Sequence, residues 1–350
     1  MYTTNLFRAE ELRYPQIKAF ERERTICFLP VSALEVHGPH LPLGMDVFMA
    51  RWLAEETARL FAEAHPDWTV VRYMPLTLGT DELPLAGSMN ATQRELYRVL
   101  LAHGASLAQA GYRYVVVTNG HGGPRHAAGL EAACRKASRR HGIEMFTPSI
   151  AVLYGIVSGQ RFDRLETVLG RHLTAQERAG LLNGEHAATM ETSLILAERP
   201  ELVDPMYWQL GLAGPPPFQP LAALGVPLAG LLGRGDPQRQ ARVQEIVGSL
   251  AGSIGWLLNA RYGYGGPEVT YQGDPSAASA ELGHAIRQVA VEDCLALVES
   301  VTHGERRAVE VRSIASDPAV IHPLFLRRAA LAAGAVAALF LLTRRRRKAR

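Results

Sequence analysis

Short apolar runs alternate with longer amphipathic stretches along most of this chain. Residues 25–31 form an apolar run of strand length, and 46–64 has apolar residues at the spacing of a helix that faces a core. The same alternation predicts further strands at 69–78, 112–118 and 143–148 and further helices at 91–110, 124–140, 191–198, 238–259 and 276–301. Strands that alternate with helices are typical of an α/β domain. We therefore predict one α/β domain with a mainly parallel sheet and helices on both faces.

Residues 211–236 interrupt this pattern. They are rich in Gly, Pro and Leu and include three consecutive prolines at 215–217. Because proline lacks a backbone donor and ends regular elements, we predict an irregular excursion here rather than a core element.

The C-terminal end has a different composition again. Residues 329–343 are almost entirely apolar, and 344–350 contains six basic residues and no acidic one. A helix of this apolar length covers about 22 Å, less than the roughly 30 Å of a bilayer core. The pattern leaves open a helix that lies on or crosses the membrane, held at anionic head groups by its basic end, and a helix that packs in an oligomer or frays. We place the catalytic body at 1–310, a linker at 311–326 and the apolar helix with its basic tail at 327–350.

Composition excludes several classes of protein. Without the basic tail, 31 Lys and Arg residues face 34 acidic residues, so the body is slightly acidic and does not have the charge of a nucleic-acid-binding protein. Three scattered cysteines do not form a disulfide framework. The N-terminus lacks an apolar core behind a basic start, so we predict no secretory signal and a cytoplasmic protein, attached to the inner face of the membrane if the tail binds there.

Strong polar groups follow directly on the first apolar run. Glu35 and His37 are two residues apart, so on an extended backbone both side chains point to the same side. Asp46 follows a turn rich in Gly and Pro, where the next helix begins. Carboxylates and imidazoles that converge at a strand end can bind a divalent cation. From the residues alone, the alternatives are an ion pair between Glu35 and His37 and a helix N-cap for Asp46.

A second polar cluster surrounds His121. It lies in the sequence Asn-Gly-His-Gly-Gly, between a predicted strand and a predicted helix. Open α/β sheets bind their ligands at the carboxyl ends of strands, and the flanking glycines let the backbone approach whatever His121 contacts. The alternative is a phosphate held by this loop and the helix start, although the loop lacks the GxxxxGK[ST] pattern.

A third cluster contains Glu185, His186 and Glu191. His186 and Glu191 are five residues apart, about 140° around an ideal helix, so they do not share a helix face. Both reach one site only if His186 precedes the first helical turn. The alternative is a capped helix start in solvent.

Taken together, the three clusters resemble the creatininase family. The resemblance rests on Glu-Val-His at 35–37, the run that continues to Asp46, Asn-Gly-His-Gly-Gly at 119–123, and Glu-His-Ala to Glu-Thr-Ser within 185–193. These motifs occur in the family's order and span most of the first 200 residues. The family has an α/β fold with a parallel sheet, usually forms hexamers and hydrolyses amide-type C–N bonds with a pair of divalent metals.

The resemblance implies a binuclear metal site in this chain. It places Glu35 and His121 on one ion and His37 on the other, with Asp46 bridging the two. Carboxylates combined with neutral imidazoles suit Zn, which we expect, and also Mn or Fe.

Two further roles are implied by comparing this chain with branches of the family. Creatininase itself has a glutamate ligand at the place of Gly123, which argues against creatinine as the substrate here. Branches that share the glycine pair take this ligand from the position of Glu191. The resemblance also implies His186 as the proton-transfer residue, with Glu185 beside it as a second catalytic candidate.

We therefore predict a metal-dependent hydrolase that cleaves an amide-type C–N bond of a small molecule or small peptide, with a metal-bridging hydroxide as the attacking group. The alternatives are a peptidase or deformylase in cofactor biosynthesis with the same metal site, and an inactive metal-binding scaffold. The segments 80–90 and 211–236 would set the substrate, and neither identifies it.

Overall fold

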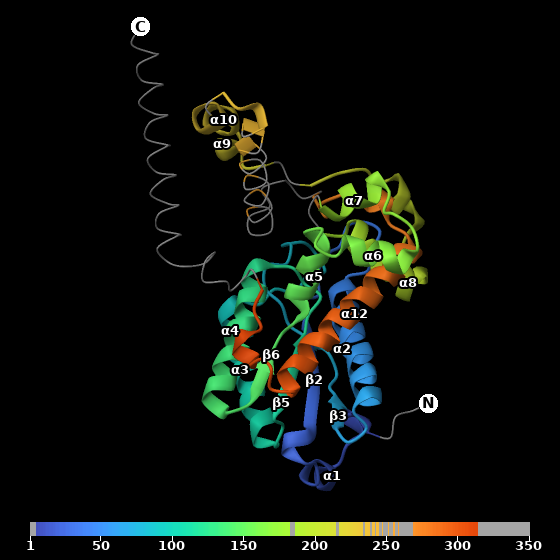
Figure 1. The fold of residues 1–350 in the computed structure, drawn as a ribbon, viewed down its shortest axis with the longest axis vertical. Coiled ribbons are helices and arrows are strands. Elements are labelled where there is room, and N and C mark those ends of the chain that lie inside the picture. Colours follow the sequence, from blue (N-terminus) through green and yellow to red (C-terminus); the bar gives the residue numbers. More distant parts are fainter. Residues whose placement is uncertain are drawn as a thin grey trace.

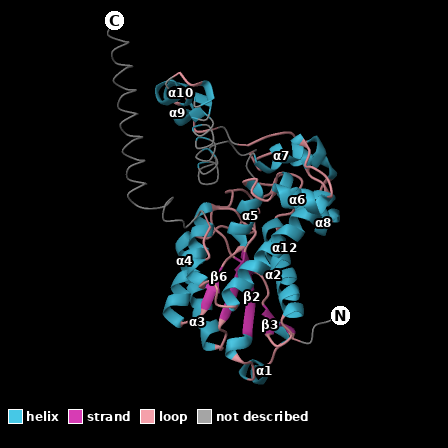
Figure 2. Cartoon of the chain, viewed as in Figure 1, coloured by secondary structure: helices cyan, strands magenta, loops and turns pink. Residues whose placement is uncertain are grey.

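An all-parallel sheet forms the centre of the molecule (Figure 2). The computed structural model describes residues 5–182, 186–214, 217–233 and 269–313, with scattered positions between 235 and 258. The strand order is β1-β3-β2-β5-β6, and β4 pairs with the end of β2. The strands are β1 (Leu6–Arg8), β2 (Thr25–Ser32), β3 (Thr69–Arg72), β4 (Leu76–Thr77), β5 (Tyr114–Thr118) and β6 (Glu144–Phe146).

Helices cover both faces of the sheet, as predicted (Figure 1). Because side chains alternate along a strand, Cys27 and Leu29 of β2 pack with α3 (Gln93–Gln109) and α4 (Pro124–His141) on one face. Ile26 and Phe28 pack on the other face, against α2 (Met45–Ala64) and α12 (Ala280–Thr302). The helix α3 begins two residues later than predicted, directly after Thr92, which forms a capping box with Glu95.

A second apolar core lies beyond the carboxyl edge of the sheet. There α2 and α12 pack with four shorter helices, of which only the last was predicted: α5 (Ser149–Val157), α6 (Phe162–Leu169), α7 (Ala175–Leu182) and α8 (Thr189–Glu198). Their side chains include Met49, Leu165 and Ile286, all of them buried. This second core fixes α8 relative to the sheet.

The observed elements also differ from the prediction at 69–78 and at 211–236. The strand predicted at 69–78 is two strands, since Pro75 has no backbone donor and β4 pairs separately with β2. The segment 211–236 contains α9 (Gln219–Ala222) and α10 (Gly225–Gly233), where we expected irregular structure. The structure also describes α1 (Tyr14–Lys18), before β2.

Some predicted segments lie wholly or mostly outside the described residues. These are the helix at 238–259, the apolar helix and basic tail at 327–350, and the linker beyond residue 313. Within the described part of the chain, no helix is long and apolar enough to cross a membrane. The packed body continues to Ser313, which is buried and donates a hydrogen bond from its backbone to Glu131.

Candidate metal centre

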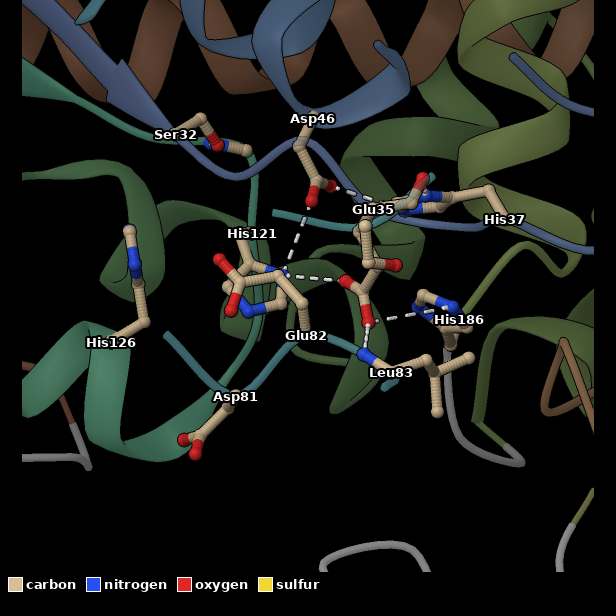
Figure 3. Close-up of polar contacts among 12 residues, drawn as sticks. Ser32, Glu35, His37, Asp46, Asp81, Glu82, Leu83, His121, His126 and His186 are labelled. Atoms are coloured by element: carbon tan, nitrogen blue, oxygen red, sulfur yellow. Dashed lines mark hydrogen bonds and ion pairs between the residues drawn. The ribbon is translucent and has the colours of Figure 1, made fainter. Parts of the chain in front are cut away.

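The loops that follow β2 and β5 meet at the carboxyl edge of the sheet (Figure 3). Glu35 and His37 follow β2, and His121 follows β5, which is the neighbouring strand. The chain continues from β2 to β3 on one side and from β5 to β6 on the other, so the two loops lie at the point where the strand order reverses. Open α/β sheets place ligand sites at such a point.

Asp46 stands between the two histidines. Its Oδ1 lies 3.2 Å from Nε2 of His37, and its Oδ2 lies 3.2 Å from Nδ1 of His121. The same nitrogen of His121 is 3.1 Å from Oε2 of Glu35, and Nε2 of His37 is 3.6 Å from Oε2 of Glu191. Two sets of ligand atoms therefore share Asp46. One set consists of Glu35, Asp46 and His121, and the other of His37, Asp46 and Glu191. The ligand atoms of each set lie within 4.8 Å of one another.

The atoms that face one another lack ordinary partners. Within the described residues, Oε2 of Glu35, Nε2 of His37 and both carboxylate oxygens of Asp46 have no hydrogen-bond partner. All three side chains are buried, with at most 1% of each exposed. Buried polar atoms are almost always satisfied, and where they have no partner within the protein, a site for a bound ion is one standard reason. Nitrogen and carboxylate oxygen are also ligands that transition metals prefer.

The far side of each ring is held by a backbone carbonyl. Nδ1 of His37 lies 3.0 Å from the carbonyl oxygen of Glu35, and Nε2 of His121 lies 3.1 Å from that of Thr80. Each of these nitrogens therefore donates, so the other nitrogen of each ring, which faces the carboxylates, is the one that can bind a proton or a metal ion. Such outer contacts fix the tautomer of metal-binding histidines.

The carboxylates of this cluster strongly favour a bound positive charge. Burial alone would lower the pKa of His37, but the carboxylates of Asp46 and Glu191 raise the pKa to about 10. Burial opposes the ionised form of Asp46 as well, yet the two histidines hold its pKa well below the usual value. A cation at this position, whether a proton or a metal ion, is therefore strongly stabilised.

The loop before α8 brings His186 to the same place. Since α8 begins at Thr189, His186 precedes the first helical turn, which is the condition for sharing a site with Glu191. Its ring lies 4.4 Å from the ring of His37, between centroids. Its Nε2 donates to the carbonyl oxygen of Val36 at 2.8 Å and lies 3.9 Å from Oε1 of Glu35.

Glu185 and Asp46 complete the account of the predicted residues. Glu185 lies outside the described residues. Asp46 is not the N-cap of α2: that position is Gly44, and Asp46 is inside the first turn with no capping hydrogen bond. The phosphate alternative is disfavoured because His121 faces the carboxylates of Glu35 and Asp46, which would repel a phosphate.

Glycine allows the His121 loop to approach Asp46. A Cβ atom at Gly120 would overlap the backbone carbonyl of Asp46, and one at Gly123 would overlap Nε2 of His121. The loop is also held by Asn119, whose side-chain oxygen accepts from the backbone N–H of His121 at 2.9 Å and whose side-chain nitrogen donates to the carbonyl of His121 at 2.7 Å.

The loop at 80–83 also belongs to the site, although none of its residues was predicted as a ligand or a catalytic residue. Its Leu83 N–H donates to Oε1 of Glu35 at 2.6 Å, which leaves Oε2 to face His121. Asp81, which has a left-handed φ of 81°, accepts from the backbone and guanidinium of Arg125. Glu82 is buried next to these groups, and its pKa is raised to about 7 by burial, with a further contribution from the neighbouring carboxylates. The only signal in the sequence was the segment 80–90, noted as a region that would affect substrate choice.

A parallel α/β sheet with a buried His, Asp and Glu cluster at its carboxyl edge defines an α/β protein with a candidate two-metal centre. The family model described as creatininase, creatinine amidohydrolase, matches residues 10–298, so the chain belongs to the creatininase family.

Comparisons with individual proteins agree with this family and fold. Over 100 residues the chain is 35% identical to the mycofactocin precursor peptide peptidase of Mycobacterium tuberculosis (strain CDC 1551 / Oshkosh), a match over 27% of this chain and 39% of that peptidase. A solved structure from Bacteroides fragilis NCTC 9343, assigned as a creatinine amidohydrolase, matches 85% of this chain and 97% of its own, at 18% identity and a TM-score of 0.57. A manganese form of creatininase matches 84% and 97%, at 21% identity and a TM-score of 0.53. At these identities the two structures establish the shared fold.

Proposed function

We propose that this chain is a metal-dependent hydrolase that cleaves an amide-type C–N bond with two divalent metal ions. Glu35, Asp46 and His121 would hold one ion, and His37, Asp46 and Glu191 the other. The observation that carries the proposal is the set of buried, inward-facing ligand atoms without hydrogen-bond partners, with the two oxygens of Asp46 directed to different histidines.

The reaction needs an activated water and a proton for the departing nitrogen. Divalent ions bound there would lower the pKa of a water molecule and polarise the amide carbonyl. Backbone groups hold the ligands in place, since the N–H of Leu83 donates to Glu35 and the carbonyl oxygen of Thr80 accepts from the ring of His121. His186, beside Glu35 and His37, is the residue that we assign to protonate the departing nitrogen.

The donor set favours a first-row transition metal. Two imidazole nitrogens and three carboxylates suit Zn, Mn or Fe. We expect Zn, with Mn or Fe as alternatives, and the manganese form of creatininase has the same fold.

The surroundings of Gly123 argue against creatinine as the substrate. Creatininase has a glutamate ligand at this place, whereas here a Cβ at residue 123 would overlap His121 and lie 2.8 Å from Cβ of Asp81. No larger side chain fits without moving the loop. We assign the corresponding ligand to Glu191, which approaches from α8.

A small peptide is the second candidate substrate. The supporting observation is the 35% identity with the mycofactocin precursor peptide peptidase over 100 residues. Hydrolysis of short peptides and of simple amides by the same preparation would separate the two substrate classes.

Metal content tests the proposed centre directly. Elemental analysis of the purified protein is expected to give about two equivalents of a transition metal, and both the Glu35→Gln and the His121→Ala variants should lose metal. His65→Ala is the matched control, since His65 pairs with Glu299 away from the site and should retain both ions. A wild-type protein that contains no metal and does not take up added Zn or Mn would refute the proposal.

A further inference from the structure

Glu82 is a buried carboxyl group that the proposed mechanism does not use. Only 1% of the residue is exposed, and neither of its carboxyl oxygens has a hydrogen-bond partner among the described residues. In that part of the chain no basic side chain forms an ion pair with it, and the neighbouring Arg125 is bound by Asp81 instead. Burial of a carboxyl group without hydrogen-bond partners is unfavourable, because the group gives up its contacts with water and gains nothing in exchange. Such a group calls for a functional explanation.

Hydrogen bonds hold the backbone around Glu82, so its buried side-chain position follows from an ordered loop. The N–H of Leu83 donates to Glu35, and the side chain of Asn90 donates to the carbonyl oxygen of Glu82 at 3.2 Å. The preceding residue, Asp81, is held in a left-handed conformation that costs a non-glycine residue free energy. Strained backbone of this kind concentrates at functional sites.

A glycine makes room for the carboxyl group. A Cβ atom at Gly79 would collide with Oε1 of Glu82 and with the backbone of Ala33. The side chain therefore extends over Gly79 towards the metal centre. Figure 3 shows Glu82 beside His121, on the side of the centre away from His186. Its carboxyl interacts electrostatically with His121, Glu35 and Asp46.

We propose that Glu82 is a substrate-contacting residue whose carboxylate binds a cationic or N–H-rich group of the substrate beside the amide that is cleaved. An ammonium, amidinium or ureido group supplies the N–H donors that both oxygens lack, and charge-assisted hydrogen bonds of this kind are the strong ones. The proposal rests on the proposed function for the position of the amide. It narrows the substrate class to amides that carry such a donor group nearby.

A matched pair of small amides tests this assignment. β-Alaninamide and propanamide differ only in the terminal ammonium group, and their binding at pH 7 can be followed by ligand-observed NMR titration. The wild-type protein is expected to bind β-alaninamide about tenfold more tightly, a difference of about 1.4 kcal/mol. Glu82→Gln and, as a second neutral variant, Glu82→Ala should bind both amides equally. Glu131→Gln is the control, because Glu131 is a buried carboxyl paired with Ser313 away from the site, and it should keep the preference.

The outcomes separate this proposal from the proposed function. The assignment is overturned if the wild type binds neither amide or binds both equally. It is also overturned if Glu82→Gln still prefers β-alaninamide. Elemental analysis of the same samples should show unchanged metal in Glu82→Gln, whereas a loss of metal would make Glu82 a ligand and refute its contact with the substrate. A metal-free wild type with a preference that depends on Glu82 would refute the hydrolase and leave this assignment standing.

Discussion

At the scale of single residues, the centre depends on Asp46 more than on any other ligand candidate. It enters from the first turn of α2, where the helix dipole favours a carboxylate, and it makes no capping hydrogen bond there. Each of its oxygens faces a different histidine, His37 or His121. Among the close ion pairs, Glu35 lies 3.1 Å from His121 and Glu191 lies 3.6 Å from His37. Asp46 therefore belongs to both ligand sets, and a change there affects both.

Replacing these carboxylates one at a time should remove different numbers of ions. Asn at 46 preserves shape but removes the charge from both sets, so Asp46→Asn is expected to reduce the metal content from about two equivalents to nearly none. Glu191→Gln should reduce it to about one. Elemental analysis after dialysis against Zn or Mn measures both. Asp67→Asn, which affects a surface ion pair with Arg24, should change nothing. Retention of one equivalent in Asp46→Asn would contradict the bridging role.

The charge of His37 should appear in the stability of the metal-free protein. The carboxylates of Asp46 and Glu191, against the opposing effect of burial, raise its pKa from 6.5 to about 10. Because the folded pKa lies above the unfolded one, the imidazolium stabilises the fold fully below about pH 6.5, and this contribution is lost as the pH rises through about 10. With a chelator present, the free energy of unfolding of the wild type should exceed that of His37→Gln by up to a few kcal/mol at pH 6.5.

This difference should shrink steadily as the pH is raised to 10. Denaturant titrations at several pH values, with excess EDTA, measure it directly. The metal-loaded protein is the control, since an ion there replaces the proton and removes this pH dependence. A difference between wild type and His37→Gln that is independent of pH would show that the imidazole is not charged in the metal-free fold.

At the scale of elements, the sequence predicted those whose apolar pattern is long and regular. The strands β2 and β5 and the helices α2 and α4 lie within two residues of their expected bounds, because continuous apolar runs and helical periodicity identify them. The helices α5, α6 and α7 were missed because they have only eight or nine residues each, too few to establish a period. Pro75 split a strand that the apolar pattern alone presents as continuous.

Some residues of the candidate site could likewise be predicted from the sequence, and others could not. Glu35, His37, Asp46 and His121 could be predicted because strong polar groups next to buried strands and glycine turns have few structural explanations. Glu82 could not, because it belongs to no motif and its missing partners become visible only when the loop is folded against the sheet.

The contact between α8 and α12 should be sensitive to a single methyl group. A Cβ atom at Gly283 would overlap the backbone carbonyl of Ser193 and lie 2.9 Å from Cβ of Ala197, so the two helices would have to separate. Gly283→Ala is expected to lower the free energy of unfolding by about 3 kcal/mol. Since α8 carries Glu191, metal binding should weaken as well. Thermal unfolding and metal titration test both effects.

Gly129→Ala in α4 is the control for this substitution. The nearest atoms to its Cβ would be side-chain carbons of Gln93 and Leu96, at 3.2 and 3.3 Å, and the nearest backbone atom, the carbonyl oxygen of Gln93, would lie at an ordinary contact distance of 3.8 Å. The gain of about 1 kcal/mol in helix propensity offsets that crowding, so its stability should stay close to that of the wild type. Equal stability of both variants would show that α8 and α12 can separate without cost.

At the scale of the whole molecule, the two cores meet at the metal centre. The sheet supplies Glu35, His37 and His121 from its carboxyl edge, and the second core positions α8 with Glu191. The centre therefore forms only when both cores are packed, which couples metal binding to global folding. Removal of metal with a chelator should accordingly lower the unfolding temperature of the whole body rather than of one part.

The folded body should extend at least to Ser313, past the limit predicted at residue 310. The backbone of Ala308 donates to Glu144 at 2.8 Å, Val311 is 4% exposed in the core beneath β6, and Ser313 donates to Glu131. Burial of a valine contributes about 2 kcal/mol, and an unsatisfied buried carboxylate costs about 1–3 kcal/mol more.

A chain that ends after Ser313 is therefore expected to keep the unfolding temperature, metal content and hydrolytic activity of the full chain. One that ends after residue 307 should lose about 3 kcal/mol in denaturant unfolding. If the two truncations are equally stable, the last segment does not belong to the folded body, and a loss of activity in the longer one would give the tail a part in catalysis.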